Sequence, residues 1–310
     1  MGGRDKPDHD VEGRCFDDER ARHKNRPMNY RHGFHAGNFA DILKHVVLAR
    51  ILLHLGLKAS PYRAVDTHAG AGRYDLGSDE ALRTHEWKDG IARLDQAPLA
   101  PAVEALLTPW REAVAAARAA HGPETYPGSP WICRHAMRPF DRLIAAELHP
   151  PTFQKLQAAL AGDKRVKPLA IDGWHALRAN VPPAERRGLV LIDPPFEERD
   201  EFETLTTELI AAHRKWPTGT YAIWYPIKDE RAVARMIEAI VSAGITRLLR
   251  LEIDVDRPDA AGGLSATGLL LINPPWTLAD DARILLPALT ERLAQGPRTR
   301  YLCEPILPDG

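Results

Sequence analysis

The sequence predicts an α/β fold with a mostly parallel β-sheet that helices cover on both faces. Three observations favour this fold class. Apolar runs of strand length alternate with segments that have the spacing of helices. The runs are apolar throughout, which is typical of strands buried on both faces. Several runs also end directly in an acid or a glycine, as expected where parallel strands open onto a ligand.

The composition is that of a globular protein from a reducing compartment. The 310 residues are 44% hydrophobic and 27% charged, and Cys15, Cys133 and Cys303 have no paired spacing. We therefore expect neither a disulfide framework nor a cysteine zinc site. No basic and apolar signal segment opens the chain, and no apolar run reaches membrane-spanning length. These features predict a cytoplasmic protein without a membrane partner, and no obligate protein partner is evident.

The beginning of the chain is unusually charged. Residues 1–27 are polar and without periodicity, which predicts a disordered extension ahead of one domain at 28–310. From Arg20 to Arg63 the chain contains nine Lys or Arg residues, one acid and five histidines. Such a stretch suits a phosphate-rich partner, and a solvated helix face explains it equally well.

Strands and helices alternate from residue 40 onward. Residues 40–57 have apolar side chains at helical spacing and predict the first helix. The predicted strands are 62–70, 142–150, 166–173, 189–196, 220–227, 246–255 and 268–275. The clearest connecting helices are 151–162, 202–216 and 229–244.

One gap breaks this alternation. About seventy residues separate Gly72 from the strand that contains Leu143, whereas a strand–helix–strand unit needs roughly thirty. Residues 99–122 within the gap are Ala-rich and have helical spacing. We therefore expect a helical insertion at about 74–125.

Each of the first four predicted strands ends in a carboxylate. These acids are Asp66, Glu147, Asp172 and Asp193. In an open parallel sheet, ligands bind beyond the carboxyl ends of the strands. Chance is a weak explanation for four such acids, so the sequence predicts one binding site along this edge.

The turn after the first strand, "DTHAGAGRY" (66–74), contains the glycines of a ligand-binding loop. Gly70 and Gly72 let the backbone approach a ligand closely. However, Asp75 occupies the third glycine position of a dinucleotide fingerprint. A nucleoside cofactor without a diphosphate therefore fits better than NAD.

S-adenosylmethionine is the cofactor that these parts favour. Glu147 can accept from a ribose diol, and Asp172, beside Gly173, can accept from an adenine amino group. The carboxylate of the cofactor needs donors. The available donors are Lys44, His45 and His68. For His45, a buried histidine bonded to the backbone is the alternative interpretation.

A metal site is a further alternative for the first predicted helix and the residues before it. The side chains that crowd together there are His32, His35, Asp41 and His45. No pair of these histidines encloses a catalytic glutamate, and no carboxylate cluster shares the stretch. We therefore predict no metal at this position.

The stretch "LVLIDPPFEE" (189–198) has the groups that methylation of an exocyclic amine requires. The lone pair of such an amine is delocalised into the ring, so a site must accept both N–H bonds. Asp193 offers a side-chain oxygen, Pro194 a rigidly held carbonyl, and Phe196 a face on which a flipped base can stack. The alternative is a rigid turn with Phe196 in the core. "LLLINPPWTL" (269–278) has the same pattern, and local sequence does not separate the two.

These residues resemble the bacterial 23S ribosomal RNA adenine-N6 methyltransferases of the RlmJ family. The resemblance spans about residues 29–307. The motifs that carry it are "YRHGFHAGNFADILKH" (30–45), "DTHAGAGRYDLGS" (66–78), "YPGSP" (126–130), "ELHP" (147–150), "AIDGW" (170–174), "RRGLVLIDPPFE" (186–197) and "YAIWYPI" (221–227).

The resemblance implies a class I S-adenosylmethionine-dependent methyltransferase fold, which is Rossmann-like, with an antiparallel last strand and an inserted helical subdomain. It implies Asp193 as the catalytic residue and contact of Tyr30, near Arg31, with the RNA substrate. The positions that it implies for cofactor binding are His45, His68, Ser129, Glu147, Asp172, Gly173 and Asp193. Ser129 is expected at a helix N-cap.

Two features depart from the family, and one motif is reassigned by it. Phe196 stands where the family usually has tyrosine, and the acidic extension has no counterpart. The antiparallel strand implied for 268–276 places "NPPW" at the edge opposite the cofactor. We therefore expect a structural role there, with strand exit and packing of Trp276.

The favoured function is transfer of a methyl group to N6 of an adenine in 23S rRNA. A DNA adenine methyltransferase is disfavoured because no separate target-recognition domain is evident. A non-catalytic RNA-binding protein on a methyltransferase scaffold is disfavoured by the four intact acids.

Overall fold

A computed structural model describes residues 31–258 and 263–306 of the chain. The predicted extension 1–27, Tyr30 and Cys15 therefore lie outside the described residues. Within the described ranges, no helix is both long enough and apolar enough to cross a membrane.

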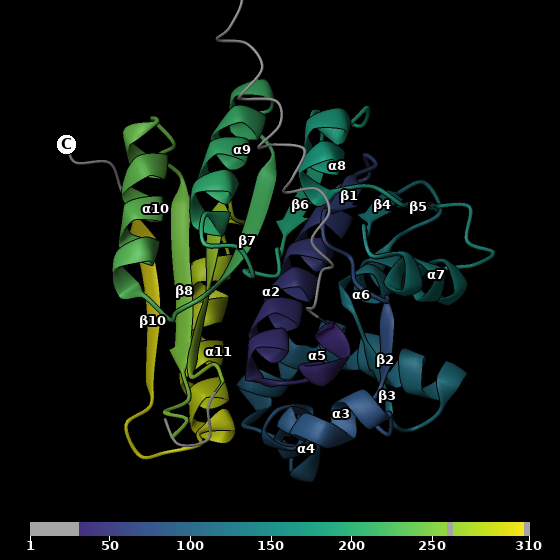
Figure 1. Cartoon of the computed structure of the whole chain (residues 1–310), viewed down its shortest axis with the longest axis vertical. Coiled ribbons are helices and arrows are strands. Elements are labelled where there is room, and N and C mark those ends of the chain that lie inside the picture. Colours follow the sequence, from purple (N-terminus) through teal and green to yellow (C-terminus); the bar gives the residue numbers. More distant parts are fainter. Residues whose placement is uncertain (1–30, 259–262, 307–310) are drawn as a thin grey trace, which may run out of the picture. The chain divides into compact units, whose positions relative to one another are not determined.

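An eight-stranded sheet forms the centre of the fold, in the order β10-β8-β9-β7-β6-β1-β4-β5 (Figure 1). β1, β4, β5, β6 and β7 pair in parallel with one another, and β9 is antiparallel to both β7 and β8. The strands are β1 (Arg63–Asp66), β4 (Arg142–Ala146), β5 (Val166–Leu169), β6 (Gly188–Ile192), β7 (Thr220–Pro226), β8 (Leu248–Asp254), β9 (Ala266–Ile272) and β10 (Arg300–Ile306).

This topology confirms the class I methyltransferase fold. All seven predicted strands form, and β9 is the antiparallel strand that was expected from residues 268–276. β10 was not predicted. It pairs with β8 along one side only, at the edge of the sheet. Glu304 and Pro305 break its apolar pattern, and an edge strand tolerates both residues.

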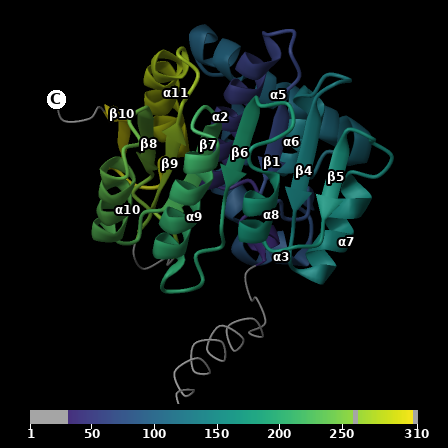
Figure 2. The same ribbon diagram turned by 90° about the horizontal axis from the view of Figure 1, so that it is seen from above.

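Helices cover both faces of the sheet (Figure 2). On one face lie α2 (Phe39–Gly56), α6 (Ser129–Ala136), α7 (Pro150–Ala159) and α11 (Leu278–Leu293). On the other lie α8 (Gly173–Asn180), α9 (Glu201–Lys215) and α10 (Glu230–Ser242). Successive strand residues alternate between the two cores, with Ala64 in the first and Val65 in the second. Both faces of the sheet are therefore buried, as the apolar strands predicted.

The expected insertion range, 74–125, contains three helices and a 3₁₀ turn. They are α3 (Asp79–Thr84), η2 (Glu86–Asp89), α4 (Ile91–Gln96) and α5 (Pro101–His121). A second 3₁₀ turn, η1 (His32–Phe34), precedes α2. Two short strands bracket the range, β2 (Arg73–Asp75) and β3 (Thr125–Pro127), and they pair antiparallel. α5 packs against α2 and α6, so α2 is covered by the sheet and by helices.

The turn "NPPW" leaves β9 at the amino ends of the parallel strands. Ile272 pairs with Tyr221 at the start of β7, so Asn273 lies at the edge opposite the carboxyl ends. The predicted packing of Trp276 is wrong, because its side chain is 80% exposed. Asn273 instead holds the turn. Its amide donates to the carbonyls of Pro217 and Gly219 at 2.8 Å each, and its φ is +50°.

Replacing Asn273 tests this structural role. Asn273→Ala loses both hydrogen bonds and places a side chain less tolerant of positive φ in the turn. We expect the free energy of unfolding to fall by about 1–3 kcal/mol. Asn273→Gly removes the bonds but tolerates the φ, so its loss should be smaller. Denaturant unfolding measures both. Equal stability of Asn273→Ala and the unchanged protein would contradict this role.

Candidate active site

The parallel strands bring the four predicted acids to one edge of the sheet. Asp66 ends β1 and is in register with Ala145 of β4 and Leu191 of β6. Glu147 follows β4 directly, and Asp193 follows β6 directly. Asp172 comes after β5, the next strand outward. The acids therefore follow the carboxyl ends of four neighbouring strands.

Asp66 is a buried carboxylate that the protein leaves largely uncompensated. Its side chain is fully buried, and burial raises the pKa of Asp66 to about 7. The nearby Ser129 hydroxyl and Lys44 lower this pKa in part. Neither carboxylate oxygen has a hydrogen-bond partner of normal geometry among the described residues. A buried acid of this kind favours a ligand that brings a positive charge or donors.

The glycine turn after β1 is closed by a tyrosine that the sequence did not reveal. Gly70 has a φ of +60°, and a Cβ there would lie 2.2 Å from the Tyr74 hydroxyl oxygen. That oxygen accepts the N–H of Ala71 at 3.1 Å. Only glycine therefore fits at position 70. Glu147 lies beside this turn, where its carboxylate accepts the N–H of His149 at 2.7 Å and burial raises its pKa.

His68 is held as a neutral ring. The Thr67 hydroxyl donates to the carbonyl of Leu191 at 3.0 Å, so it accepts from Nδ1 of His68 at 2.8 Å. Burial lowers the pKa of His68 to about 4, against the opposing effect of Asp193 and Asp172. Nε2 is then an acceptor. A predicted role as a donor to a carboxylate would require a second proton on the ring.

Gly173 packs directly against this histidine. A Cβ at position 173 would lie 2.4 Å from the Thr67 carbonyl oxygen and 2.5 Å from Nε2 of His68. The Asp172 side chain accepts the N–H of His175 at 2.8 Å and so caps α8. Asp172 therefore has a structural role in addition to the predicted one, with one carboxylate oxygen used by the cap.

Lys44 joins α2 to the end of β6. Its side chain is only 4% exposed, and Nζ lies 2.5 Å from Oδ2 of Asp193 and 2.9 Å from Oδ1 of Asp41. Nζ also lies 5.8 Å from the centre of the Trp224 ring. A buried ammonium needs partners of this kind to be stable. Lys44 therefore contacts the predicted catalytic residue in addition to lining the predicted cofactor edge.

Asp41, the second carboxylate beside Lys44, is itself held by two further groups. Its second oxygen, Oδ2, accepts from Nε2 of His32 at 3.0 Å and from the N–H of Gly37 at 2.9 Å. Burial raises the pKa of Asp41, but His32, Lys44 and His45 together hold it well below its usual range. Asp41 is thus a charged anchor, a role that no local pattern in the sequence marks.

His45 is buried in the same network. Its side chain is 1% exposed, and Nδ1 lies 2.9 Å from the Tyr126 hydroxyl. Burial lowers the pKa of His45 to about 3, although Asp41 opposes this effect. The alternative interpretation of a buried, bonded histidine therefore describes its position, with a tyrosine side chain in place of backbone.

Phe196 has an unusual backbone conformation. Its φ is +51°, which non-glycine residues rarely adopt and which is often found at functional sites. Its ring contacts Phe202 with centroids 4.7 Å apart and Trp224 at 5.7 Å. The ring is only partly buried. Trp224, to which the sequence assigned no role, thus contacts both Phe196 and Lys44.

Ser129 lies where the resemblance placed it, but not as an N-cap. The N-cap of α6 is Gly128, and Ser129 is the first helical residue. Gly128 donates its N–H to the carbonyl of Gly72 at 2.9 Å, which ties α6 to the glycine turn. The Ser129 hydroxyl lies beside Asp66, whose pKa it lowers, and α6 has no side-chain capping hydrogen bond.

The basic stretch Arg20–Arg63 does not form one basic face within its described part. Lys44 is buried, Arg50 pairs with Asp281 at 2.8 Å, and Arg63 pairs with Glu185 at 2.8 Å. Arg31, predicted to lie near the RNA, is 60% exposed and pairs with Glu80 at 3.2 Å. Residues 31–63, the described part of this stretch, contain five Lys or Arg residues, and of these only Arg31 and Lys58 are exposed.

Comparison with known proteins identifies the family. A family described as ribosomal RNA large subunit methyltransferase D, RlmJ, matches residues 59–302. The chain belongs to this family. Ribosomal RNA large subunit methyltransferase J of Escherichia coli (strain K12) is 39% identical over 283 residues, which cover 91% of this chain and all of that protein. The protein of the same name from Haemophilus influenzae is 38% identical over 284 residues, with the same coverage of both chains.

A solved structure supports the same fold for this RlmJ-family chain. It is a crystal structure of a protein from Legionella pneumophila strain Philadelphia 1, with a TM-score of 0.78 and 30% sequence identity. The match covers 87% of this chain and 98% of that chain. The RlmJ family and the methyltransferase fold are thereby confirmed.

The buried charge of Asp66 predicts a pH dependence of stability. The native carboxyl, with a pKa of about 7, binds its proton more tightly than the unfolded chain does at 3.8. Between these values the native state holds more protons, so stability falls as pH rises. We expect the unfolding free energy of the unchanged protein, measured without ligand, to fall relative to that of Asp66→Asn from about pH 4 to about pH 7. The two should run parallel above pH 8. Parallel curves throughout would contradict the pKa shift.

Proposed function

We propose that this chain transfers a methyl group from S-adenosylmethionine to N6 of an adenine in 23S rRNA. Membership of the RlmJ family and the names of its E. coli and H. influenzae relatives support the rRNA substrate class. The observation that carries the proposal is the Lys44–Asp193 ion pair beside Phe196, on the same sheet edge as the uncompensated Asp66.

Residues at the carboxyl ends of the parallel strands are suited to different groups of the proposed cofactor. Asp66, whose carboxylate has no hydrogen-bond partner of normal geometry in the described ranges, is suited to an ammonium group such as that of the methionine end. Gly70 and Gly173 let the glycine turn and the start of α8 pack closely against Tyr74 and His68 at this edge. Glu147 is suited to a ribose diol, and Asp172 retains one oxygen for an adenine amino group. When bound, S-adenosylmethionine supplies a methyl group on a positively charged sulfur.

In this proposal Asp193 orients the substrate amine. Its Oδ2 is held by Lys44, and no hydrogen bond joins its Oδ1 to any residue of the described ranges. Oδ1 is therefore open to accept one N–H of the adenine, while the Pro194 carbonyl accepts the other. With both hydrogens held, the nitrogen lone pair turns toward the methyl group. Positioning supplies most of the rate because the methyl donor is already reactive.

In this proposal Phe196 holds the flipped base. Phe202 and Trp224 support its ring from two sides. A base that leaves its stack loses a few kcal/mol, and stacking on an aromatic ring returns about 1–3 kcal/mol. The strained φ of Phe196 is thus explained by the need to expose a ring directly after Asp193 and the two prolines.

Transfer of labelled methyl groups into 23S rRNA from cells that lack this gene tests the proposal. The change is Asp193→Asn, whose amide oxygen can still accept from Lys44 while the Asp41 carboxylate keeps the buried ammonium paired. We expect the transfer rate to fall by roughly a thousandfold, because the charged acceptor is lost. The matched control is Asp229→Asn, at the N-cap of α10, which should remain active.

Two outcomes would contradict the proposal. Full activity of Asp193→Asn would remove the mechanism. Preferential labelling of duplex DNA in competition with the rRNA would change the substrate class. Circular dichroism and thermal unfolding of both variants confirm that each is folded.

Two substitutions at position 196 separate stacking from the hydroxyl that the family usually carries there. Phe196→Ala should lower kcat/KM for the rRNA by roughly 10- to 100-fold, because the stacking surface is removed. Phe196→Tyr keeps the ring and should stay within about threefold of the unchanged protein. Steady-state kinetics at saturating cofactor measure both. If the Ala variant matches the Tyr variant, the base does not stack on this ring.

A further inference from the structure

A row of exposed cations runs along the edge of the sheet opposite the candidate active site. Six strands point in one direction, because β9 is antiparallel to both β7 and β8. An exposed Lys or Arg stands at the start of each of these strands or a few residues before it. In spatial order from β8 to β5 these are Arg247, Lys215, Arg186, Lys58, Arg142 and Lys164. We call these six residues the basic row.

The row keeps its charge because the neighbouring acids are already paired. None of its six members forms an ion pair with a carboxylate in the described part of the chain. Asp141 is held by Arg138 at 2.8 Å, and Glu185 by Arg63 at 2.8 Å. Each acid in these positions is thus neutralised by an arginine that does not belong to the row.

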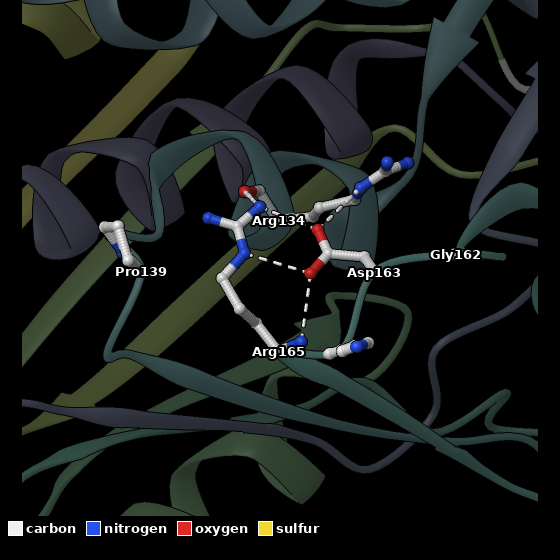
Figure 3. Close-up of a pocket in the computed structure, with 6 residues that line it drawn as sticks. Arg134, Pro139, Gly162, Asp163 and Arg165 are labelled. Atoms are coloured by element: carbon white, nitrogen blue, oxygen red, sulfur yellow. Dashed lines mark hydrogen bonds and ion pairs between the residues drawn. The ribbon is translucent and has the colours of Figure 1, made fainter.

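Asp163, beside Lys164, shows this pairing most clearly. Figure 3 shows Arg134 and Arg165 converging on its carboxylate, at 3.0 Å and 2.6 Å. Two cations face one anion, so the group is positive overall before Lys164 is counted. These residues line a shallow hollow together with Pro139 and Gly162. The β5 end of the basic row therefore combines uncompensated charge with a concave surface.

Helix dipoles explain only part of the pattern. Cations are favoured in the last turn of a helix, and the effect fades beyond it. Lys215 is the last residue of α9 and fits this explanation. Lys164 lies five residues after the end of α7, and Arg186 six residues after the end of α8. Most of the row therefore stands where a helix dipole no longer favours a cation.

The spacing of the row suits a polyanion. Neighbouring strands lie about 4.8 Å apart, so six intervals from β8 to β5 span roughly 29 Å. A row of this length can meet several phosphates of a nucleic-acid backbone at once. At the active-site edge Asp66 is buried and Asp193 is paired with Lys44, whereas the partly exposed carboxylates of Glu147 and Asp172 repel phosphates. We infer that the basic row is a second contact surface for the phosphate backbone of the RNA substrate, away from the catalytic edge; this inference rests on the proposed function.

Salt-dependent binding of 23S rRNA to the full chain tests the inference. The test variant is Lys164→Gln with Arg186→Gln. The matched control is Lys155→Gln with Arg235→Gln, two exposed cations of α7 and α10 without ion pairs in the described ranges. Removing one cation that binds a phosphate should lower the slope of log K against log salt by about 0.7–0.9. We expect the magnitude of the slope of the test variant to fall by about 1.4–1.8, which makes binding roughly 25- to 60-fold weaker at 0.1 M salt when the affinities are equal at 1 M. The control should match the unchanged protein.

Methyl transfer measured on the same variants separates this inference from the proposed function. The hairpin that carries the target adenine is limited to the few base pairs that cover the catalytic edge, so that it does not extend to the basic row, and both variants should methylate it at the unchanged rate. Equal binding slopes for the test and control variants would overturn the basic row. Loss of hairpin methylation by the test variant would also overturn it, because the row would then act on the catalytic edge. Absence of transfer by the unchanged protein would contradict the proposed function instead.

Discussion

The burial of the Lys44 charge is the constraint on which the rest of the site depends. An ammonium group taken out of water is stable only when carboxylates surround it. Asp41 and Asp193 provide them at 2.9 and 2.5 Å. The helix that carries Lys44 must therefore lie where its side chain reaches the end of β6. α2 can take this position because nearly all its residues are buried, against the sheet, α5, α6 and α11. The ion pair in turn fixes the start of the turn that presents Phe196.

Strand direction determines which of two similar motifs faces the site. "DPPF" follows β6 and opens at the carboxyl ends, where Asp66 and Glu147 also lie. "NPPW" follows the antiparallel β9 and opens at the other edge, where Asn273 bonds to the chain before β7. The two motifs also share a residue at positive φ, Phe196 in one and Asn273 in the other. In the first the strained residue presents a ring, and in the second it makes two hydrogen bonds.

Patterns within a few consecutive residues predicted strands and strand ends, but they did not predict contacts between segments that are distant in the sequence. Seven of the eight strands of the large sheet, the four acids and the Asp193–Phe196 turn could be predicted because apolar runs and strand ends are visible in a few residues. The Lys44–Asp193 pair joins positions 149 residues apart, and no local pattern marks it. His45 meets Tyr126 for the same reason. Trp276 was expected to pack because it is aromatic, yet Asn273 already satisfies the turn. Exposure of a single side chain depends on tertiary packing that sequence spacing does not contain.

The distribution of charge across the sheet limits how a polyanion can approach. The catalytic edge gathers carboxylates, which suits a cationic cofactor but repels phosphates. Lys44 does not relieve this repulsion, because it is buried and its charge is shared by two acids. In the proposed reaction only a neutral base enters the acidic edge, and base flipping makes that separation possible. The basic row offers the backbone phosphates cations that lie away from these acids. Under the proposed function, uncompensated cations at the opposite edge can attract the RNA while the acids stay available for a cationic cofactor.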